Sequence, residues 1–227
     1  MAKSFKISRK ELSQPDQFIN TTDMILAYFS RHKTRFIYLF IVLAIFILSI
    51  TLINYNQSKN SLRMESLYSE MEKISVLGGG KGSEEINQMN EKLKEFSQSK
   101  QKQRATLMIA DKYFNIGQYD QALELYKIIE SESSKNTLSR KIAMVGIAYS
   151  LEGKKDFNKA IVTYQKVIKS FNDYPLFNIY LSIVRCHELS NEKSSALLIL
   201  REMKVKFASH NKIMIVDEKI KKLDVKL

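Results

Sequence analysis

Residues 36–53 form a long uninterrupted apolar run, FIYLFIVLAIFILSITLI. These 18 residues carry no charge, and 14 of them are Leu, Ile, Phe or Val. At about 1.5 Å per residue, a helix of this length spans roughly 27 Å, close to the hydrocarbon core of a bilayer. Its apolar residues occur on every side, whereas a core helix of a soluble protein keeps a polar face. We therefore predict a transmembrane helix over residues 36–55, with residues 36–53 in the membrane.

A cleaved signal peptide fits this run less well than a permanent anchor. The apolar part of a signal peptide covers about 7–15 residues and is followed by a cleavage site of small residues. Here the run is longer, starts after 35 residues and ends in Leu-Ile-Asn-Tyr.

The charges that flank the run predict its orientation. Residues 1–35 contain seven Lys and Arg residues, whereas the twenty residues after Ile53 contain three. Lys and Arg near a membrane end are retained on the cytoplasmic side. We expect a single-pass inner-membrane protein of a bacterium, with a cytoplasmic N-terminus and a periplasmic C-terminal domain.

Residues 1–35 are predicted to be a basic cytoplasmic leader. Pro15-Asp16 interrupts the chain, and Thr22 or Asp23 is suited to cap a helix that begins near Met24. Two interpretations of this segment stay open. The leader either contains a short helix that lies on an anionic membrane surface, or it is a plain basic flank of the anchor.

Residues 56–100 are predicted to be a helical spacer. Apolar residues recur at helical spacing in residues 56–76, which predicts either a helix packed on the domain or a stalk. Glycines then cluster in residues 78–82 around Lys81. A Walker phosphate loop needs Gly, four residues and then Gly-Lys-Ser/Thr after a strand, so we interpret this cluster as a hinge.

A repeat begins in the segment ADKYFNIGQYDQALELY, which starts at Ala110. It resembles the tetratricopeptide repeat, in which two antiparallel helices approach closely at small residues and an aromatic residue fills the space beside them. Ala110 and Ala122 match the small positions and Tyr113 and Tyr126 the aromatic ones. Gly117 matches the turn between the two helices.

Two weaker copies follow. The second has Gly146, Tyr149, Gly153, Phe157, Ala160 and Tyr164 in these roles, with two extra residues expected in its turn after Gly153. The third covers residues 177–205 and is degraded, since Val184 and His187 stand where small and aromatic residues are expected.

The last apolar residues, Ile213, Val216, Ile220 and Leu223, recur at helical spacing opposite a charged face, as a solenoid cap requires. The predicted fold is all-α: one N-terminal transmembrane helix, then a solenoid of about three degenerate helix pairs with a C-terminal capping helix. The repeat domain is expected to cover residues 101–227.

Composition and motifs argue against other classes of protein. The formal net charge is +12, but Lys alternates with Glu along helical faces and no nucleic-acid motif is present. Cys186 is the single cysteine, and its neighbour His187 diverges from it by about 100° on a helix. The sequence contains no HExxH, GxSxG or CxxC motif. We expect no enzyme, and no catalytic, cofactor or metal site.

Stacked repeats form a concave groove lined by the first helix of each pair, where peptides bind. Arginines beside apolar positions are suited to hold a carboxylate while apolar residues pack alongside it; the alternative is that these arginines are ordinary solvated surface. The expected groove residues are Arg104, Leu107, Asp111 and Asn115 in the first repeat, Arg140, Ala143, Ile147 and Ser150 in the second, and Arg185 in the third.

The order of a basic leader, one membrane helix, a helical spacer and degenerate repeats resembles the YfgM-type family, the ancillary subunit of the SecYEG translocon. The leader ISRKELSQPDQF also resembles the openings of such proteins. The resemblance implies a periplasmic domain that associates with the translocon and with a membrane-anchored periplasmic chaperone, and that aids newly exported proteins. It implies no catalytic residues.

A second interpretation stays open: a repeat scaffold of another envelope system, such as cell division, outer-membrane assembly or a secretion apparatus. Membership of an outer-membrane lipoprotein class is disfavoured, because no cysteine follows an N-terminal lipobox. An enzyme is the most distant class and would need a pocket of converging titratable groups.

Overall fold

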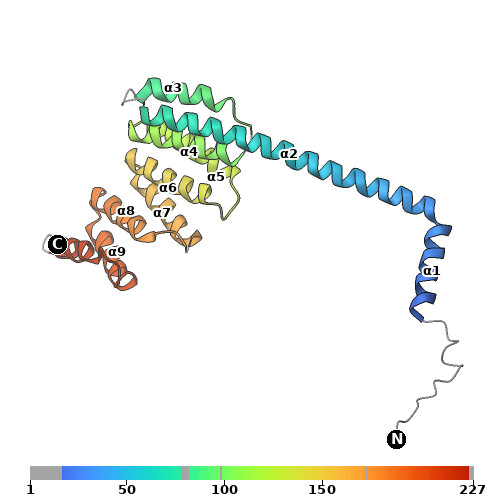
Figure 1. The fold of residues 1–227 in the computed structure, drawn as a ribbon. Coiled ribbons are helices and arrows are strands. Elements are labelled where there is room, and N and C mark those ends of the chain that lie inside the picture. The colour runs from blue at the N-terminus through green and yellow to red at the C-terminus, as the bar shows by residue number, and fades with distance from the viewer. Residues whose placement is uncertain (1–16, 78–81, 98, 172, 225–227) are drawn as a thin grey trace, which may run out of the picture. The chain divides into compact units, whose positions relative to one another are not determined.

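The computed structural model describes residues 17–77, 82–97, 99–171 and 173–224, without the side chains of residues 17–22 and Leu77. Within these ranges every regular element is a helix and no strand occurs (Figure 1). The helices are α1 (Gln17–Arg31), α2 (Lys33–Leu77), α3 (Gly82–Leu93), α4 (Lys100–Asn115), α5 (Tyr119–Glu132), α6 (Leu138–Gly153), α7 (Phe157–Ser170), α8 (Leu176–Leu189), α9 (Lys193–Lys206) and α10 (Ile213–Asp224). The break expected at Pro15 and most of the hinge expected at residues 78–82 lie outside the described residues.

The chain forms two compact units, residues 1–60 and residues 61–227. Helix α2 runs through the boundary between them, so the predicted membrane segment and the start of the predicted spacer are one continuous helix.

In the first unit the apolar side chains of α2 point outward. Even Ile50, the least exposed of the large apolar residues from Ile37 to Ile53, is 42% exposed. The hydroxyl groups of Ser49 and Thr51 donate hydrogen bonds of 2.8 Å to the carbonyl oxygens of Ile45 and Leu48, so both are satisfied within the helix. By length and composition, α2 is the one helix among the described residues that could cross a membrane.

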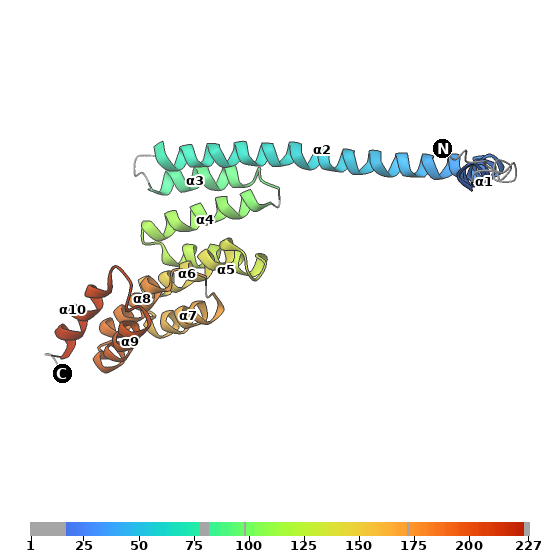
Figure 2. The same cartoon turned by 60° about the horizontal axis from the view of Figure 1, so that its bottom comes forward.

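The second unit is a stack of helix pairs, α4 with α5, α6 with α7 and α8 with α9 (Figure 2). From α3 onward, each helix packs against the next one along the chain, α4 also contacts α6, and α10 covers α9. The predicted all-α solenoid with a C-terminal capping helix is therefore confirmed.

The C-terminal part of α2 forms a further pair with α3 ahead of these three. Met64 and Met71 of α2 and Ile86 and Met89 of α3 are each at most 2% exposed and share one apolar cluster. The solenoid thus begins one helix pair earlier than the repeat motif in the sequence indicates, and the end of α2 is a packed helix.

A buried ion pair ties this first pair to the repeats. The Nζ atom of Lys112 on α4 lies 2.5 Å from Oε1 of Glu85 on α3, and it donates a 2.8 Å hydrogen bond to the carbonyl oxygen of Ser75 on α2. Glu85 is only 5% exposed, so removing the lysine would leave an uncompensated buried charge. Lys112 therefore holds three helices together.

The turns inside the three repeats have the same geometry. Gly117, Lys155 and Asn191 occupy the left-handed region at φ 78°, 63° and 60°. In each turn the next amide donates to the carbonyl oxygen five residues back, at 2.9, 2.9 and 2.8 Å, which is a Schellman motif. The turn after α6 therefore contains no extra residues, and the expected two-residue insertion after Gly153 is wrong.

The equivalent turns set the register of the repeats. The turn residues Gly117 and Lys155 are 38 residues apart, whereas Lys155 and Asn191 are 36 apart. The second spacing is shorter because α8 contains 14 residues, whereas α4 and α6 contain 16 each. Ala148, rather than Gly146, takes the place of Ala110. Gly146 instead faces the preceding pair, where a Cβ atom would lie 2.5 Å from the ring of Tyr126.

The predicted small contact residues of the second helices are fully enclosed. Ala122, Ala160 and Ala196 are each 0% exposed, on α5, α7 and α9. A larger side chain at these positions would have to push the paired helices apart.

Candidate partner-binding surface

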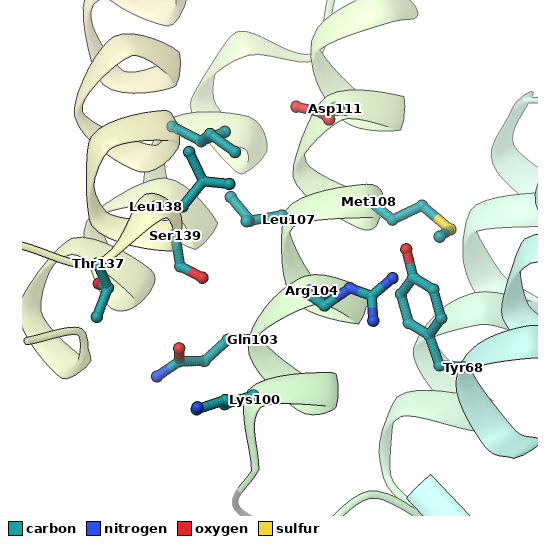
Figure 3. A pocket seen from close by; sticks show the side chains of 11 residues that line it. Tyr68, Lys100, Gln103, Arg104, Leu107, Met108, Asp111, Thr137, Leu138 and Ser139 are labelled. Carbon is teal, nitrogen blue, oxygen red and sulfur yellow. The ribbon is translucent and has the colours of Figure 1, made fainter. Parts of the chain in front are cut away.

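A cavity of about 650 Å³ lies in the second unit on the face of the first helices of the pairs (Figure 3). Helices α2, α4 and α6 supply its walls. The lining residues are Tyr68, Lys100, Gln103, Arg104, Leu107, Met108, Asp111, Thr137, Leu138, Ser139 and Ile142. Its volume is within the range of ligand-binding pockets.

One end of this cavity is basic. The guanidinium carbon of Arg104 lies 4.0 Å from the centre of the Tyr68 ring, a cation–π contact between α4 and α2 (Figure 3). Arg104 also lies 3.6 Å from Glu65, yet 48% of its side chain stays exposed. Lys100, one turn earlier on α4, is exposed and carries a second positive charge to the same end.

The opposite end contains an acidic residue, Asp111, that is exposed overall but whose carboxylate is held against the buried Tyr126. Asp111 accepts a hydrogen bond from the hydroxyl of Tyr126, and burial raises the pKa of the Asp111 carboxyl above its ordinary value. Burial and the neighbouring carboxylate raise the pKa of Tyr126 as well, so its hydroxyl stays protonated and donates. Between the two ends, Leu107 of α4 faces Leu138 of α6, and Met108 of α4 points toward Tyr68 of α2 (Figure 3). The cavity is therefore apolar in the middle and charged at its ends.

The groove residues expected in the first repeat lie mostly at this cavity. Arg104, Leu107 and Asp111 line it, and only Asn115, which is exposed on the last turn of α4, is outside it.

The residues expected in the second repeat lie elsewhere. Arg140 donates to the carbonyl oxygens of Glu130 at 2.6 Å and Ser133 at 3.2 Å, and it pairs with the Glu130 carboxylate. It thus caps the C-terminal end of α5. Ala143 and Ser150 are 0% exposed, and the half-buried Ile147 packs against the core. Arg140, Ala143 and Ile147 lie two residues, or about 200°, from the positions equivalent to Arg104, Leu107 and Asp111. Ser150 lies three residues from the equivalent of Asn115, and none of the four lines the cavity.

Arg185 of the third repeat lies at a second, smaller hollow of about 310 Å³, together with Phe114 and Tyr149. Its guanidinium forms an ion pair with Glu152, and this pairing raises the pKa of Arg185. Glu152 also accepts a 2.8 Å hydrogen bond from the hydroxyl of Tyr164. The charge of Arg185 is therefore largely used within the protein.

Sequence reasoning missed several residues of the cavity. Tyr68 precedes the recognisable repeats, and nothing in the sequence ties it to α4. Ile142 corresponds to Arg104 once the left-handed turns are aligned. The sequence held a signal for this alignment, because Ala160 follows Lys155 at the same spacing at which Ala122 follows Gly117.

Cys186 and His187, the adjacent cysteine and histidine outside the cavity, make contacts within the fold. Cys186 is 0% exposed, and burial raises the pKa of its thiol to about 12. The neighbouring His187 pairs with Glu192 at 2.7 Å, a contact within its own repeat. Across the residues that the structure describes, no group of three or more His, Cys, Asp or Glu side chains is placed to hold a metal ion.

Paired helices, left-handed turns and a cavity on the first helices define a solenoid scaffold of the tetratricopeptide-like class. The chain belongs to the tetratricopeptide repeat-like domain family, whose model matches residues 27–173. The matched range includes part of α1 and all of α2, and it ends just after α7, the second helix of the second repeat. Scaffolds of this class serve protein–protein interactions and are typically not enzymes.

Two solved structures have a similar fold. Two crystal structures of nearly identical TPR-like repeats of a putative kinesin light chain from Podosopora anserina, one of them a Q17M variant, match with a TM-score of 0.57 at 13% identity. The matches cover 71% of this chain and 84% and 85% of those chains. At this identity the likeness concerns the fold alone. No curated protein matches the chain.

Proposed function

We propose that this protein is a membrane-tethered adaptor that binds other proteins through the cavity between α2, α4 and α6. The observation that carries the proposal is an accessible cavity of about 650 Å³ with an apolar middle and a basic end. Stacked repeats offer peptides a concave surface on this face, and this hollow lies on it.

The chemistry of the cavity favours a peptide segment as its occupant. Leu107, Met108, Leu138 and Ile142 offer apolar contacts, and Lys100 and Arg104 offer two positive charges beside them. An apolar segment with a carboxylate at one end complements both features. Asp111 at the other end favours a segment that is neutral or basic there.

Charge reversal tests this site. Lys100→Glu with Arg104→Glu should abolish capture of a bound partner, whereas Lys127→Glu with Lys166→Glu should leave it intact. Lys127 on α5 and Lys166 on α7 are exposed and lie outside the cavity, so both double variants change the net charge equally. Equal capture by the two variants, with unchanged circular dichroism, would place partner binding elsewhere.

The proposed layout is a cytoplasmic leader in residues 1–35, a membrane helix in residues 36–55 and an exported remainder. Residues 101–227 form the repeats, and residues 56–100, expected as a spacer, include the first helix pair of the solenoid. The outward apolar side chains of α2 and the seven-to-three asymmetry of Lys and Arg support it. Alkaline phosphatase fused after Leu227 should be active, since it folds only after export. Activity of a cytoplasmic reporter at that position would reverse the orientation.

The partners proposed are those that the YfgM-type architecture implies: translocon subunits, a membrane-anchored periplasmic chaperone and newly exported proteins. The match of the repeat family over residues 27–173 supports the class, and the resemblance of the leader and anchor supports the finer assignment. Reciprocal purification in mild detergent should recover translocon subunits with the parent protein. Recovery of cell-division, outer-membrane-assembly or secretion-apparatus components instead would assign the adaptor to that system.

A further inference from the structure

Helix α1 has an apolar face that stays largely exposed among the residues that the structure describes. On a helix of 3.6 residues per turn, Ile25 and Phe29 lie on one face, and Asp23 and Ala27 lie on the opposite one. Ile25 is 51% and Phe29 is 45% exposed. An exposed apolar stripe on a helix of 15 residues is costly in water, so it needs a covering environment.

The chain bends where α1 meets α2. His32 separates the two helices, and the rings of Phe29 and Phe36 stack with their centres 4.2 Å apart. In a straight helix, seven residues rise by about 10.5 Å, so these rings meet because the chain turns between them. The ring of His32 also packs against the ring of Tyr28, with their centres 4.9 Å apart. The apolar face of α1 is thereby joined to the first turn of the apolar run.

Three cations surround this bend. Arg31, Lys33 and Arg35 are all exposed, and Asp23 is the single acidic residue in residues 17–35. Lys and Arg beside a membrane end are attracted to the anionic headgroups of the cytoplasmic leaflet. Charge and apolar surface therefore favour the same occupant.

We infer that α1 is an interfacial helix that binds anionic phospholipid, with Ile25 and Phe29 sunk at the boundary between headgroups and acyl chains and with Arg31, Lys33 and Arg35 among the headgroups. The inference rests on the proposed membrane crossing of α2, because covalent continuity then holds α1 within one turn of the bilayer surface. The leader is thus a second membrane contact that fixes the start of the span.

Single-cysteine reporters in the full-length protein test this inference. Cys186 is fully buried, so the parent protein labelled under native conditions measures the background. Ile25→Cys and Phe29→Cys report one face of α1, Asp23→Cys and Ala27→Cys the other. Each labelled protein is placed in nanodiscs containing phosphatidylglycerol, and the fluorophore is quenched either by lipid with a nitroxide high on its acyl chain or by aqueous iodide.

The two faces should respond in opposite ways. Labels at positions 25 and 29 should be quenched several-fold more by the lipid nitroxide than labels at positions 23 and 27, and iodide should reverse the order. Equal quenching of all four labels would overturn the inference. Weak quenching by both agents on the apolar face would also overturn it, because that face would then be covered by protein.

Two further measurements distinguish the membrane crossing of α2 from the interfacial binding of α1. A label at Leu43→Cys, in the centre of the apolar run, should be quenched by a nitroxide deep in the acyl chains whatever α1 does. Failure there would remove the proposed membrane crossing, whereas failure confined to α1 removes only the interfacial helix. In purely zwitterionic nanodiscs the contrast between the faces should shrink, and an unchanged contrast would refute the role of the three cations.

Discussion

The two units of this protein use the same apolar side chains in opposite ways. In α2 of the first unit, Tyr38 is 70% exposed and Leu48 is 63% exposed, whereas Tyr164 and Leu200 in the repeats are 0% exposed. Identical residue types cannot be adapted to the same solvent in both arrangements. The proposed membrane crossing accounts for this difference, because lipid would cover the apolar side chains of α2 whereas the second unit buries its own.

The first prediction places charge in the apolar run. Leu43→Arg with Phe46→Arg should release the protein from membranes, since each arginine at a helix centre costs about 2.5–3.5 kcal/mol of insertion free energy. The two together are comparable to the roughly 4–8 kcal/mol that the run contributes. The measurement is the fraction that sediments with membranes after an alkaline wash. Leu62→Arg, at a residue that is 71% exposed beyond the run, is the control and should sediment as the parent does.

The second prediction compares a buried and an exposed tyrosine. Tyr164→Ala should lower the free energy of unfolding by about 3–5 kcal/mol, because it leaves a cavity in the core and removes the donor to Glu152. Tyr38→Ala should leave the unfolding of the repeat domain unchanged. Thermal unfolding followed by circular dichroism would measure both, and similar melting temperatures for the two variants would contradict the contrast between the units.

The third prediction concerns close contact between paired helices. Ala160→Leu should cost about 1–3 kcal/mol by overpacking α6 against α7. Val162→Leu, two residues later on the same helix, should cost little because Val162 is 51% exposed. Denaturant titration would separate them. A parent-like midpoint for Ala160→Leu would refute the assignment of the small contact position.

The fourth and smallest prediction is a pH dependence. Burial raises the pKa of Asp111 above the ordinary 3.8, so its ionised form is disfavoured in the folded protein. The penalty is absent below pH 3.8 and appears as the pH rises through the raised pKa. Asp111→Asn keeps an acceptor for Tyr126 and should be more stable than the parent at pH 7, by no more than about 1 kcal/mol because water screens the accessible carboxylate. At pH 3 the two stabilities should coincide; a gap of constant size would show that the charge is not its cause.

The sequence predicted the parts of the fold that rest on local periodicity. The apolar run, the paired helices, the buried alanines and the capping helix depend on residue spacing within one or two helices, which a single sequence displays. The packing of the end of α2 against α3 and α4 does not depend on such local spacing, so the sequence does not display it. It depends on contacts such as that between Lys112 and Ser75, which lie far apart in the chain and have no motif.

The site was harder to predict because it depends on register. Arg104, Leu107 and Asp111 follow from the well-formed first repeat, and the structure places all three at the cavity. The second copy was aligned on Gly153, although the left-handed turn is made by Lys155. Glycine is the residue expected in that conformation, so a lysine there gives no sequence signal. The resulting shift moved Arg140, Ala143 and Ile147 by two residues and Ser150 by three, so all four lie on other faces of α6.

Site-specific photocrosslinking in living cells tests the central claim most directly. A photoreactive residue at Gln103 or Ser139, both at the cavity, is compared with one at Val162 or Leu198, which are exposed on α7 and α9. Adducts with a defined envelope protein should form from the two cavity positions and should disappear when Lys100 and Arg104 are changed to Glu. Adducts that form equally from the outer positions, or that persist in the charge-reversed variant, would contradict binding through the cavity.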